Sequence, residues 1–418
     1  MKTVWPLASV ESLCTRVTSG GTPSRSNSAY YENGTIPWIK TGELKDWYVD
    51  AIQEKITEVA LRESSAKLFP PDTVLLAMYG DGKTMGSVGL LRKSCATNQA
   101  CCAMLPDPAK CDPKFLLYSL IYFRPAILKL TIAGAQRNLN GKTIKQFKIG
   151  APDLEDQRRI ASILAAYDNL IENNTRRIAI LEEMARRIYE EWFVRFRFPG
   201  HEQVKRVESE LGLIPEGWKV QTVEQTFQIL GGGTPSKAEP AYWEGGTINW
   251  YSPTDLTRAG TSFMEQSADR ITALGLAKSS AKLFPPMSVM LTSRATIGVV
   301  AINTNEACTN QGFITCLPNS DYPLWLLYHW LKANVETFIG LGTGATFKEI
   351  TKGTFKGIRL LVPPQNLVGA FSSTSEQLML LSLNLQRKNR NLRVTRDLLL
   401  PKLISGELDV STLSEPTV

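Results

Sequence analysis

The sequence is poor in histidine: of its 418 residues only two, His201 and His329, are of this type. A hydrolase of the Ser-His-Asp kind needs an imidazole base, and imidazole is also a frequent ligand of catalytic zinc. His201 stands in "FPGHEQ", which has the composition of a linker, and His329 stands within "WLLYHWL", where a structural role in a helix is favoured. The scarcity of histidine therefore argues against both of these site types.

Long apolar runs are missing as well. No stretch of about eighteen uncharged apolar residues occurs, so no membrane-spanning helix is predicted. The first ten residues, "MKTVWPLASV", lack the apolar core and cleavage site of a signal peptide, and the seven cysteines include no CxxC pair. We therefore expect a cytoplasmic protein. The net charge of +7 is compatible with a polyanionic partner without identifying one.

Cofactor motifs are incomplete or absent. The stretch "AMYGDGKT" (Ala77 to Thr84) ends like a phosphate-binding loop, but Ala77 stands where the first glycine is needed. No glycine-rich cofactor loop follows a predicted strand, and the three Pro-Pro pairs are followed by Asp, Met and Gln rather than by the aromatic residue of N6-adenine methyltransferases. We expect neither an ATP site nor a methyl-donor site in this chain.

What the sequence does contain is a long internal repeat. "GGTPSRSNSAYYENGTIPWIK" (Gly20 to Lys40) returns as "GGTPSKAEPAYWEGGTINWYS" (Gly232 to Ser252), "SSAKLFPPDTVLL" returns as "SSAKLFPPMSVML", and "ATNQ" returns as "CTNQ", in the same order. A period of about 210 residues is far too long for a solenoid repeat. The chain therefore holds two copies of one globular domain.

Each copy is followed by a segment with heptad periodicity. From Asp156 to about Phe193 there is no Pro or Gly, and two seams of residues recur every seven positions; they are Ile160, Tyr167, Asn174, Leu181 and Ile188, and Leu164, Ile171, Ile178, Ala185 and Trp192. After the second copy, Phe371, Leu378, Leu385, Leu392 and Leu399 recur at the same interval up to Pro401. Two long helices are predicted, which pack against each other and act as a ruler between the copies. Asn174 and Asn389 lie on the seams, where they either fix the register or are tolerated near solvent.

The globular copies combine short apolar segments such as "TVLLAM" with helical ones such as "FLLYSLIYFRPAILKL" (Phe115 to Leu130). This mixture, broken by Gly and Pro, is typical of an α+β domain. The predicted fold class is thus α+β, with two similar globular domains joined by two long helices that form an antiparallel coiled coil. Loops on such a framework carry the function.

At this point the sequence resembles a known family, the DNA-specificity subunit of type I restriction-modification systems. The resemblance covers the whole chain and rests on the paired GGTPS stretches, "EEWFVRFRFPG" (Glu190 to Gly200), "SELGLIPEGW" (Ser209 to Trp218) and "LLLPKLISGEL" (Leu398 to Leu408). It implies that each globular copy is a target recognition domain that reads half of a split, asymmetric DNA site. The helices would dock two methyltransferase subunits. In one departure, "DLEDQRRI" (Asp153 to Ile160) fits the family pattern, whereas its counterpart "PQNLVGAF" does not, so the two docking sites are expected to differ.

The resemblance and the repeat together divide the chain into four parts. We expect a first target recognition domain at residues 1–151, a central conserved helix at 152–198, a linker with the second target recognition domain at 199–362, and a C-terminal conserved helix and tail at 363–418.

Reading a DNA sequence requires Arg, Lys, Asn or Gln side chains at base edges, with further basic or hydroxyl groups at phosphates. Both copies supply such side chains in predicted loops. Those of the first copy are Thr22, Ser24, Arg25, Lys40, Lys45, Tyr79, Lys83, Gln136, Arg137, Asn138, Asn140 and Lys142. Those of the second copy are Lys237, Thr254, Arg258, Ser293, Arg294, Thr296, Thr343, Thr346 and Lys348.

Several of these features also have a purely structural interpretation. The GGTPS stretch is identical in both copies, which would read different bases, so a turn or a phosphate contact is favoured over base reading. Trp38 and Trp250 are expected in the core, and for the Asn-Gln pairs that follow Thr97 and Thr309 a structural or backbone role is favoured over adenine reading. Divergent loops are the stronger candidates for DNA contact; they are Tyr79 to Lys83 against Ser293-Arg294, and Gln136 to Asn140 against Ala345 to Glu349. The arginine pairs of the central helix alternate with acids, which favours a solvated or subunit-facing surface.

The expected partners are double-stranded DNA, two methyltransferase subunits and, through the complex, restriction subunits, with no membrane. The chain is expected to be non-catalytic and to hold no cofactor or metal, while S-adenosylmethionine, ATP and Mg²⁺ belong to the partner subunits. Two other classes stay open. An autonomous enzyme lacks the motifs described above, and a two-headed scaffold that binds protein or glycan would show no steep salt dependence of DNA affinity.

Overall fold

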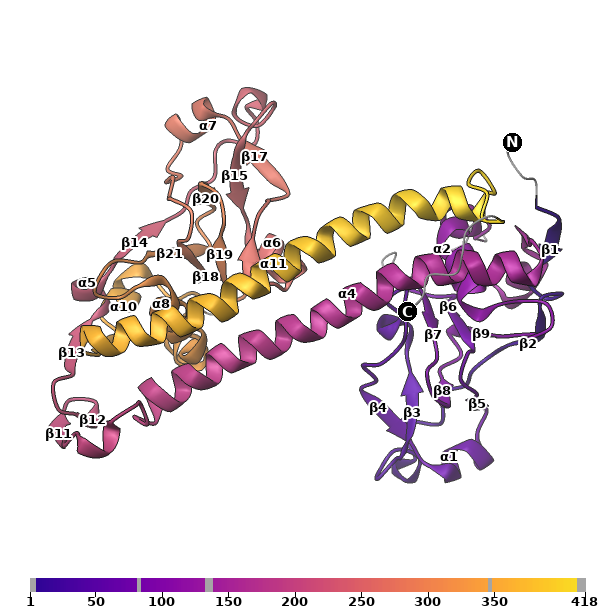
Figure 1. Cartoon of the computed structure of the whole chain (residues 1–418), viewed down its shortest axis with the longest axis horizontal. Coiled ribbons are helices and arrows are strands. Elements are labelled where there is room, and N and C mark those ends of the chain that lie inside the picture. The colour runs from indigo at the N-terminus through magenta and orange to yellow at the C-terminus, as the bar shows by residue number, and fades with distance from the viewer. Residues whose placement is uncertain (1–4, 81–83, 132–137, 345–347, 412–418) are drawn as a thin grey trace. The chain divides into compact units, whose positions relative to one another are not determined.

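The computed structural model describes residues 5–80, 84–131, 138–344 and 348–411. The chain divides into two compact units, Met1–Asn174 with Lys388–Val418, and Thr175–Arg387. Each unit contains one globular head and one part of each of two long helices, α4 (Leu154–Tyr189) and α11 (Gln365–Ile404). Figure 1 shows the elements of both units.

The first head is built on two four-stranded sheets. In the first sheet the order is β2-β9-β6-β7, all antiparallel, and in the second it is β4-β3-β8-β5, with β3 parallel to β8. A two-stranded ribbon, β1-β10, brings the start of the head against its end. The strands are β1 (Leu7–Ser9), β2 (Cys14–Ser19), β3 (Ile36–Ile39), β4 (Glu54–Ile56), β5 (Leu68–Phe69), β6 (Val74–Ala77), β7 (Val88–Leu90), β8 (Cys95–Thr97), β9 (Cys101–Pro106) and β10 (Lys148–Gly150).

The described part of this head also contains the α-helices α1 (Glu58–Glu63), α2 (Pro113–Leu128) and α3 (Gly141–Gln146). Helix α2 begins after Asp112, whose carboxylate accepts hydrogen bonds from the amides of Lys114 (2.9 Å) and Phe115 (3.0 Å). Such a cap satisfies amides that have no partner within the helix. The side chains from Phe115 to Leu120 are all buried, so α2 is a core helix of the first unit.

The second head repeats this arrangement. Its main sheet has the order β14-β21-β18-β19-β16, its second sheet β17-β15-β20, and its terminal ribbon β13-β22, while β11 and β12 form a separate hairpin. The strands are β11 (Arg206–Ser209), β12 (Gly212–Pro215), β13 (Lys219–Thr222), β14 (Gln228–Gly231), β15 (Ile248–Tyr251), β16 (Phe263–Met264), β17 (Asp269–Ile271), β18 (Val289–Thr292), β19 (Val300–Asn303), β20 (Ala307–Thr309), β21 (Phe313–Leu317) and β22 (Arg359–Val362). The helices are α5 (Val223–Thr226), α6 (Pro253–Ala259), α7 (Ala273–Ala277), α8 (Leu324–Ala333), α9 (Val335–Leu341) and α10 (Lys352–Lys356).

The two heads therefore have the same topology. Strands β14, β21, β18 and β19 follow the order of β2, β9, β6 and β7, and β15 is parallel to β20 as β3 is to β8. Helix α8, in which every side chain from Trp325 to Leu331 is buried, stands where α2 stands in the first head. The predicted α+β class and the domain duplication are confirmed.

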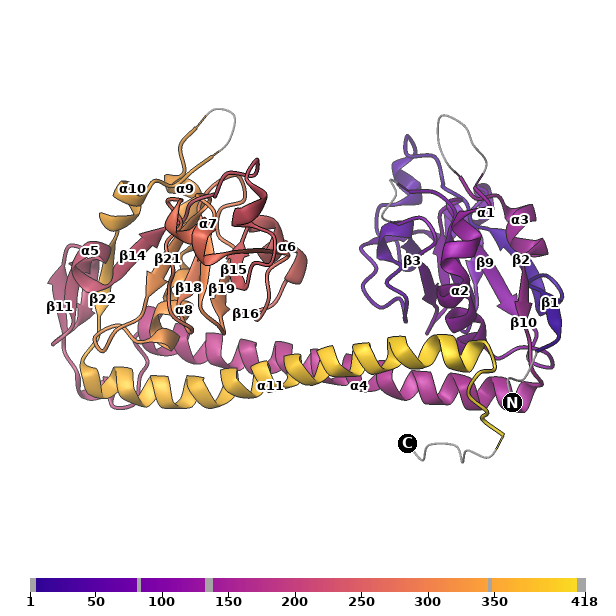
Figure 2. The ribbon, with the colours of Figure 1, turned by 90° about the horizontal axis from the view of Figure 1, so that it is seen from above.

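Within each unit the long helices lie side by side in opposite directions along one side of the head (Figure 2). The predicted seam residues of both helices are buried or half-buried, as the heptad pattern requires. The coiled coil is confirmed within each unit. Helix α11 continues beyond Pro401, where the heptad recurrence stops, to Ile404: proline removes only one hydrogen bond so near the end, and Leu403 and Ile404 are buried in the first head.

In the first unit the helix seam contains polar pairs. Asn174 donates its side-chain amide to the Oδ1 atom of Asn389 at 2.9 Å, and Asn389 donates to the carbonyl of Ile171 at 3.2 Å. Both asparagines are buried, so the register interpretation fits their surroundings better than the solvent interpretation. Asp168 of α4 forms an ion pair with Arg396 of α11 and accepts a hydrogen bond from Tyr118 of α2 at 2.7 Å. The seam and the head are thereby joined through one carboxylate.

In the second unit the seam is aromatic. His329 of α8 is stacked on Tyr189 of α4, with ring centroids 5.8 Å apart, and lies edge-on to Phe371 of α11 at 5.9 Å. Its Nε2 atom is 3.3 Å from the hydroxyl of Ser375. Burial lowers the pKa of His329 to about 3, and the charges of Lys332 and Arg186 act in the same direction. His329 is therefore a neutral part of the core, as expected from the sequence.

Among the described residues no helix is both long and apolar enough to cross a membrane. Within the same residues, no group of three or more His, Cys, Asp and Glu side chains is arranged to hold a metal ion.

We predict that His329 makes the second unit sensitive to acid. Its pKa is about 6.5 in the unfolded chain and about 3 in the folded chain, so the unfolded state binds the extra proton. The stability is complete above pH 6.5 and falls by up to about 1.4 kcal/mol per pH unit as the pH drops from 6.5 towards 3. His329→Phe, which keeps a stacking ring, should remove this contribution to the pH dependence of the free energy of unfolding, equivalent to the uptake of one proton. Urea unfolding at a series of pH values measures it. An imidazole NMR signal of His329 that titrates near pH 6.5 in the folded protein would contradict the prediction.

Candidate DNA interface

The repeated GGTPS stretch is a place where two backbone segments approach closely. A Cβ atom on Gly20 would lie 2.1 Å from the carbonyl oxygen of Thr97, and one on Gly232 would lie 1.9 Å from that of Asn310. The next glycine in each head accepts a hydrogen bond from a buried tryptophan: Trp38 donates to Gly21 at 3.1 Å, and Trp250 donates to Gly233 at 2.9 Å. The identity of the stretch in both heads therefore has a structural cause.

The polar residues of this stretch also have internal partners. The hydroxyl of Thr22 donates to the side-chain oxygen of Gln99, and that of Thr234 donates to Gln311 at 2.7 Å. The hydroxyl of Ser24 is 2.7 Å from that of Ser26. The Gln of each repeated Thr-Asn-Gln segment thus supports the glycine-rich stretch in its own head.

The cation that follows GGTPS is held in the same way in both heads. Arg25 forms an ion pair of 2.7 Å with Glu54 and lies 4.5 Å from the ring centroid of Tyr31. Lys237 forms an ion pair of 2.9 Å with Asp269 and lies 3.6 Å from the ring centroid of Trp243. Both cations are thus engaged within the protein by an acid and an aromatic face.

Lys40 shares the same carboxylate as Arg25. Its ammonium group pairs with Glu54, and the hydrogen bond from Lys40, followed by that from Arg25, keeps the pKa of Glu54 below its usual value. Three of the predicted DNA-binding cations, Arg25, Lys40 and Lys237, therefore have close internal partners.

The divergent loops of the second head converge on one another. After β18, the amide of Ser293 donates to the carbonyl of Gly312 at 2.8 Å, and the amide of Ile350 donates to the carbonyl of Ser293 at 2.9 Å. Arg294 lies opposite Glu349 in a β-bridge, and Glu349 is bridged in turn to Thr343. The amide of Ala295, which has φ of 61°, donates to the carbonyl of Lys348 at 2.9 Å.

These backbone contacts bring five predicted site residues together; they are Ser293, Arg294, Thr296, Thr343 and Lys348. All of them except Ser293 are exposed. The Nε atom of Arg294 is 3.6 Å from a carboxylate oxygen of Glu349. Glu349 lies at the end of the divergent segment Ala345 to Glu349, although it is not among the predicted site residues. Helix α9, which leads to Thr343, lies at the end of the head remote from α4 and α11 (Figure 2).

The first head uses the same construction. The amide of Met78 donates to the carbonyl of Ala100 at 2.8 Å, and the amide of Leu139 donates to the carbonyl of Met78 at 3.0 Å. Tyr79 and Asn138 are therefore brought to neighbouring positions. Tyr79 is 38% exposed and Asn138 is half-buried.

The other predicted residues are distributed more widely. Asn140 caps α3 by accepting the amide of Thr143 at 2.8 Å, and Lys142 is exposed on that helix. Thr254 and Arg258 are exposed on α6, and Lys45 is exposed before β4. Four predicted site residues lie outside the described residues, namely Lys83, Gln136, Arg137 and Thr346.

The arginine pairs of α4 that lie near its ends form ion pairs along their own helix. Arg159 pairs with Glu155 and Asp156, while Arg186 and Arg187 pair with Glu183 at 2.6 Å each. This arrangement agrees with the solvated or subunit-facing interpretation of these residues rather than with base reading.

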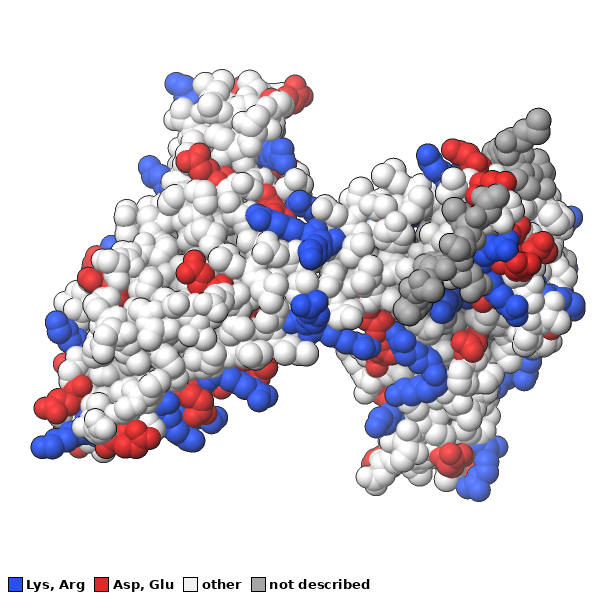
Figure 3. Space-filling view, viewed as in Figure 1, with Lys and Arg blue, Asp and Glu red and all other residues white. Residues whose placement is uncertain are grey.

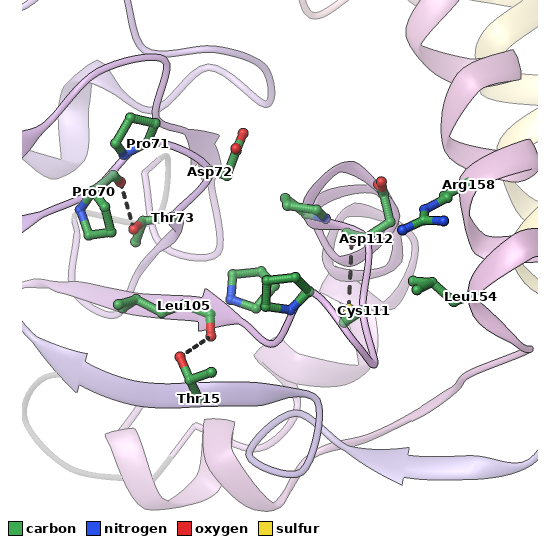
Figure 4. A pocket seen from close by; sticks show the side chains of 13 residues that line it. Thr15, Pro70, Pro71, Asp72, Thr73, Leu105, Cys111, Asp112, Leu154 and Arg158 are labelled. Carbon is green, nitrogen blue, oxygen red and sulfur yellow. Dashed lines mark hydrogen bonds between the residues drawn. The ribbon is translucent and has the colours of Figure 1, made fainter.

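A proline-walled pocket of about 460 Å³ lies in the first unit between the head and the start of α4. Pro70, Pro71 and Asp112 line it, and Figure 4 shows that Arg158 of α4 extends towards Asp112. Burial raises the pKa of Asp112. The equivalent pair, Pro285 and Pro286, lines a similar pocket of about 550 Å³ in the second head. Because neither pocket is lined by a predicted site residue, both belong to the shared framework rather than to the divergent loops.

Comparison with known proteins gives one consistent result. Residues 5–183 and 215–367 match the protein family described as the type I restriction modification DNA specificity domain. The chain is 26% identical over 408 residues to the type I restriction enzyme MjaIX specificity subunit of Methanocaldococcus jannaschii, which covers 95% of this chain and 92% of that protein. It is 23% identical over 360 residues to the HindI specificity subunit of Haemophilus influenzae, covering 71% of this chain and 77% of that protein.

A solved structure has a similar fold. The S subunit of a type I restriction-modification system from M. genitalium aligns over 96% of both chains with a TM-score of 0.59 and 15% sequence identity.

We predict that the close approach at the glycine-rich stretch cannot accept a side chain. Gly232→Ala should destabilise the protein by about 1 to 3 kcal/mol, because the methyl group meets backbone atoms that cannot move independently. Gly369→Ala is the matched control: this glycine is inside α11 with no atom within 4 Å of the added Cβ, so alanine should be neutral or stabilise by about 0.5 to 1 kcal/mol. Urea unfolding of the full chain measures both. Equal midpoints for Gly232→Ala and the unmodified protein would contradict the prediction.

Proposed function

Because the chain belongs to the family of type I restriction modification DNA specificity domains, we propose that it is the DNA sequence-recognition subunit of a type I restriction-modification complex. Each head reads one half of a split, asymmetric DNA site, and the long helices dock two methyltransferase subunits. The observation that carries this proposal is the repetition of one framework with different exposed side chains on the same pair of loops. A duplicated framework provides two readers, and divergent loops give each reader its own sequence.

The chemistry of the loops supports DNA as the ligand. Arg294 and Lys348 are exposed cations in the second head, and Thr296 and Thr343 add exposed hydroxyl groups close to them. Cations and hydroxyl groups suit phosphate oxygens, and arginine also suits the major-groove edge of guanine. Loops of this composition at the end of a rigid sheet are suited to enter a groove.

The outer faces of the long helices support protein docking. In the first unit Val394 and Leu398 of α11 are 56% and 64% exposed, and in the second unit Ile180 and Met184 of α4 are also exposed. Lys388, Arg390 and Arg393 are exposed on α11, and Figure 3 shows basic side chains gathered over the middle of this helix. Exposed apolar side chains rimmed by charge are typical of a protein interface.

The two docking sites are not equivalent in this proposal. Gln157, near the start of α4, is buried; it donates to the carbonyls of Lys110 (3.0 Å) and Pro152 (2.9 Å) and accepts from the amide of Asp112 (3.1 Å). In the aligned stretch "PQNLVGAF" of α11, Val368 occupies the place of Gln157 and cannot make these bonds. The exposed positions differ as well, because Glu155 and Arg158 of α4 align with Asn366 and Gly369 of α11, so a methyltransferase subunit meets a different surface at the start of each helix.

In this role the chain performs no catalytic step of its own. The partner methyltransferase and restriction subunits bind S-adenosylmethionine, ATP and Mg²⁺, and the complex acts on DNA in the cytoplasm. The purified chain, incubated with DNA and labelled S-adenosylmethionine, should transfer no methyl group. A scaffold that binds protein or glycan instead would give DNA affinity without the steep salt dependence that phosphate contacts impose.

We predict that exchange of one head rewrites one half of the target. A host that expresses this chain with its cognate methyltransferase subunits should carry methylated adenines in a split site, which methylome sequencing identifies. Replacing residues 232–360 with the equivalent segment of a relative should change one half-site and leave the other intact, because each head has its own framework and loops. Changes in both half-sites, or in neither, would show that the heads do not read independently.

We also predict that a charge on the outer helix face weakens assembly. The double variant Val394→Glu/Leu398→Glu should reduce the affinity for the methyltransferase subunit by at least about tenfold, because it desolvates carboxylates at an apolar contact. Thr395→Glu is the control, since residue 395 is exposed but lies at the edge of this face, about 100° from Val394 and about 60° from Leu398 round the helix. Isothermal titration of the folded chain with the methyltransferase subunit measures both. Equal affinities for the double variant and the control would exclude this face as the docking surface.

A further inference from the structure

Two positions in each head are structurally equivalent although their residues differ. In the second head, Ser293 accepts the amide of Ile350, so Arg294 and Glu349 are the next residues outward on the two segments. In the first head, Met78 accepts the amide of Leu139 in the same way, which makes Tyr79 and Asn138 the corresponding pair. The framework contacts just before each pair also match: Ser293 donates to Gly312, and Met78 donates to Ala100.

Within these few residues, the backbone contacts are the same in both heads while the side chains differ. The backbone of both heads is held by the same hydrogen bonds, and a glycine with positive φ, Gly86 or Gly298, closes the first loop in each head. The side chains carried by the equivalent pair, however, change from Tyr and Asn to Arg and Glu. Two heads that read different sequences must differ at the residues that contact bases, and this pair differs where the surrounding backbone does not.

The electrostatic state of Arg294 also differs from that of Lys237, the cation that follows the glycine-rich stretch. Lys237 is held by Asp269 at 2.9 Å and by an aromatic face, whereas the separation of Arg294 from Glu349 is 3.6 Å, which is longer than a hydrogen bond. Within the described residues, no hydrogen bond from the Arg294 guanidinium occurs, and its side chain is 49% exposed beside a Glu349 side chain that is 40% exposed. Glu349 therefore orients Arg294 without using its terminal donors.

We propose, on the basis of the proposed function, that these equivalent pairs are base-reading residues: Arg294 with Glu349 reads a G·C base pair, and Tyr79 with Asn138 reads an A·T base pair. In the major groove, guanine presents the acceptors O6 and N7, which suit arginine, and its partner cytosine presents the N4 amino donor, which suits a carboxylate. Adenine presents N6 and N7, which suit the asparagine amide, and thymine presents a methyl group, which suits an aromatic ring. The side-by-side cation and carboxylate thus match the side-by-side acceptors and donor of one G·C pair.

The test uses the full chain assembled with its methyltransferase subunits and a pool of duplexes in which each position of the half-site read by the second head is varied. Arg294→Ala and Glu349→Gln should each reduce discrimination by about 10- to 100-fold at one and the same G·C position. The double variant Arg294→Tyr/Glu349→Asn, which installs the pair of the first head, should shift the preference at that position towards A·T. Lys278→Ala, an exposed cation on the same head outside these loops, is the control and should change no position.

The outcomes separate this inference from the proposed function. If the unmodified complex methylates no defined sequence, the proposed function fails. If it methylates a split site but Arg294→Ala and Glu349→Gln relax different positions, relax an A·T position, weaken all positions equally or change nothing, then the pair does not read a base pair and the inference is overturned. In the first head, Asn138→Ala should relax one A·T position of the other half-site, and relaxation at a G·C position would overturn that assignment.

Discussion

The structure depends on a helix seam that joins segments far apart in the sequence. In the first unit Asn174 and Asn389 are hydrogen-bonded in a buried site, and Asp168 meets Arg396 and Tyr118 nearby. Because a buried amide or carboxylate is costly without its partner, only one register of α4 against α11 satisfies these groups. The head is tied to that register through Tyr118. In the second unit the register of α4 against α11 is fixed by aromatic packing, since His329 of the head fits between Tyr189 and Phe371.

The duplicated heads show which residues the fold requires and which it leaves free. Gly20 and Gly232 cannot carry a side chain, Trp38 and Trp250 must reach a carbonyl, and both features are identical in sequence and in contacts. Arg25 and Lys237 are exchanged for one another, but each keeps an acid and an aromatic ring. In the loops after β6 and β18, by contrast, the residues differ between the heads and do not keep equivalent partners. The repeat thus acts as an internal comparison, in which invariant residues belong to the framework and divergent residues are those that the proposed function assigns to base reading.

The fold could be predicted from the sequence because its signals are periodic. The heptad pattern predicts both long helices, and the internal repeat predicts two similar domains. Both signals are strong because each depends on many residues at a fixed spacing. The C-terminal end of α11 at Ile404 depends on the burial of Leu403 and Ile404 in the first head, which a local pattern does not contain. The candidate site was predictable only as loops. Composition shows that Arg25, Lys40 and Arg294 are cations, but whether a carboxylate neutralises them depends on Glu54 and Glu349, which the fold brings from elsewhere in the chain.

This distribution of charge has a consequence for how a weakly basic chain can be specific. The net charge of +7 is too small to explain tight binding by itself, and several framework cations are already paired with acids. Pairing of the framework cations limits non-specific attraction to phosphates, which is the sequence-independent part of DNA affinity. Arg294 and Lys348, by contrast, are exposed cations on the divergent loops. Under the proposed function, a head organised in this way gains most of its affinity only where the bases match, and two such heads on one chain require both halves of a split site to match at once.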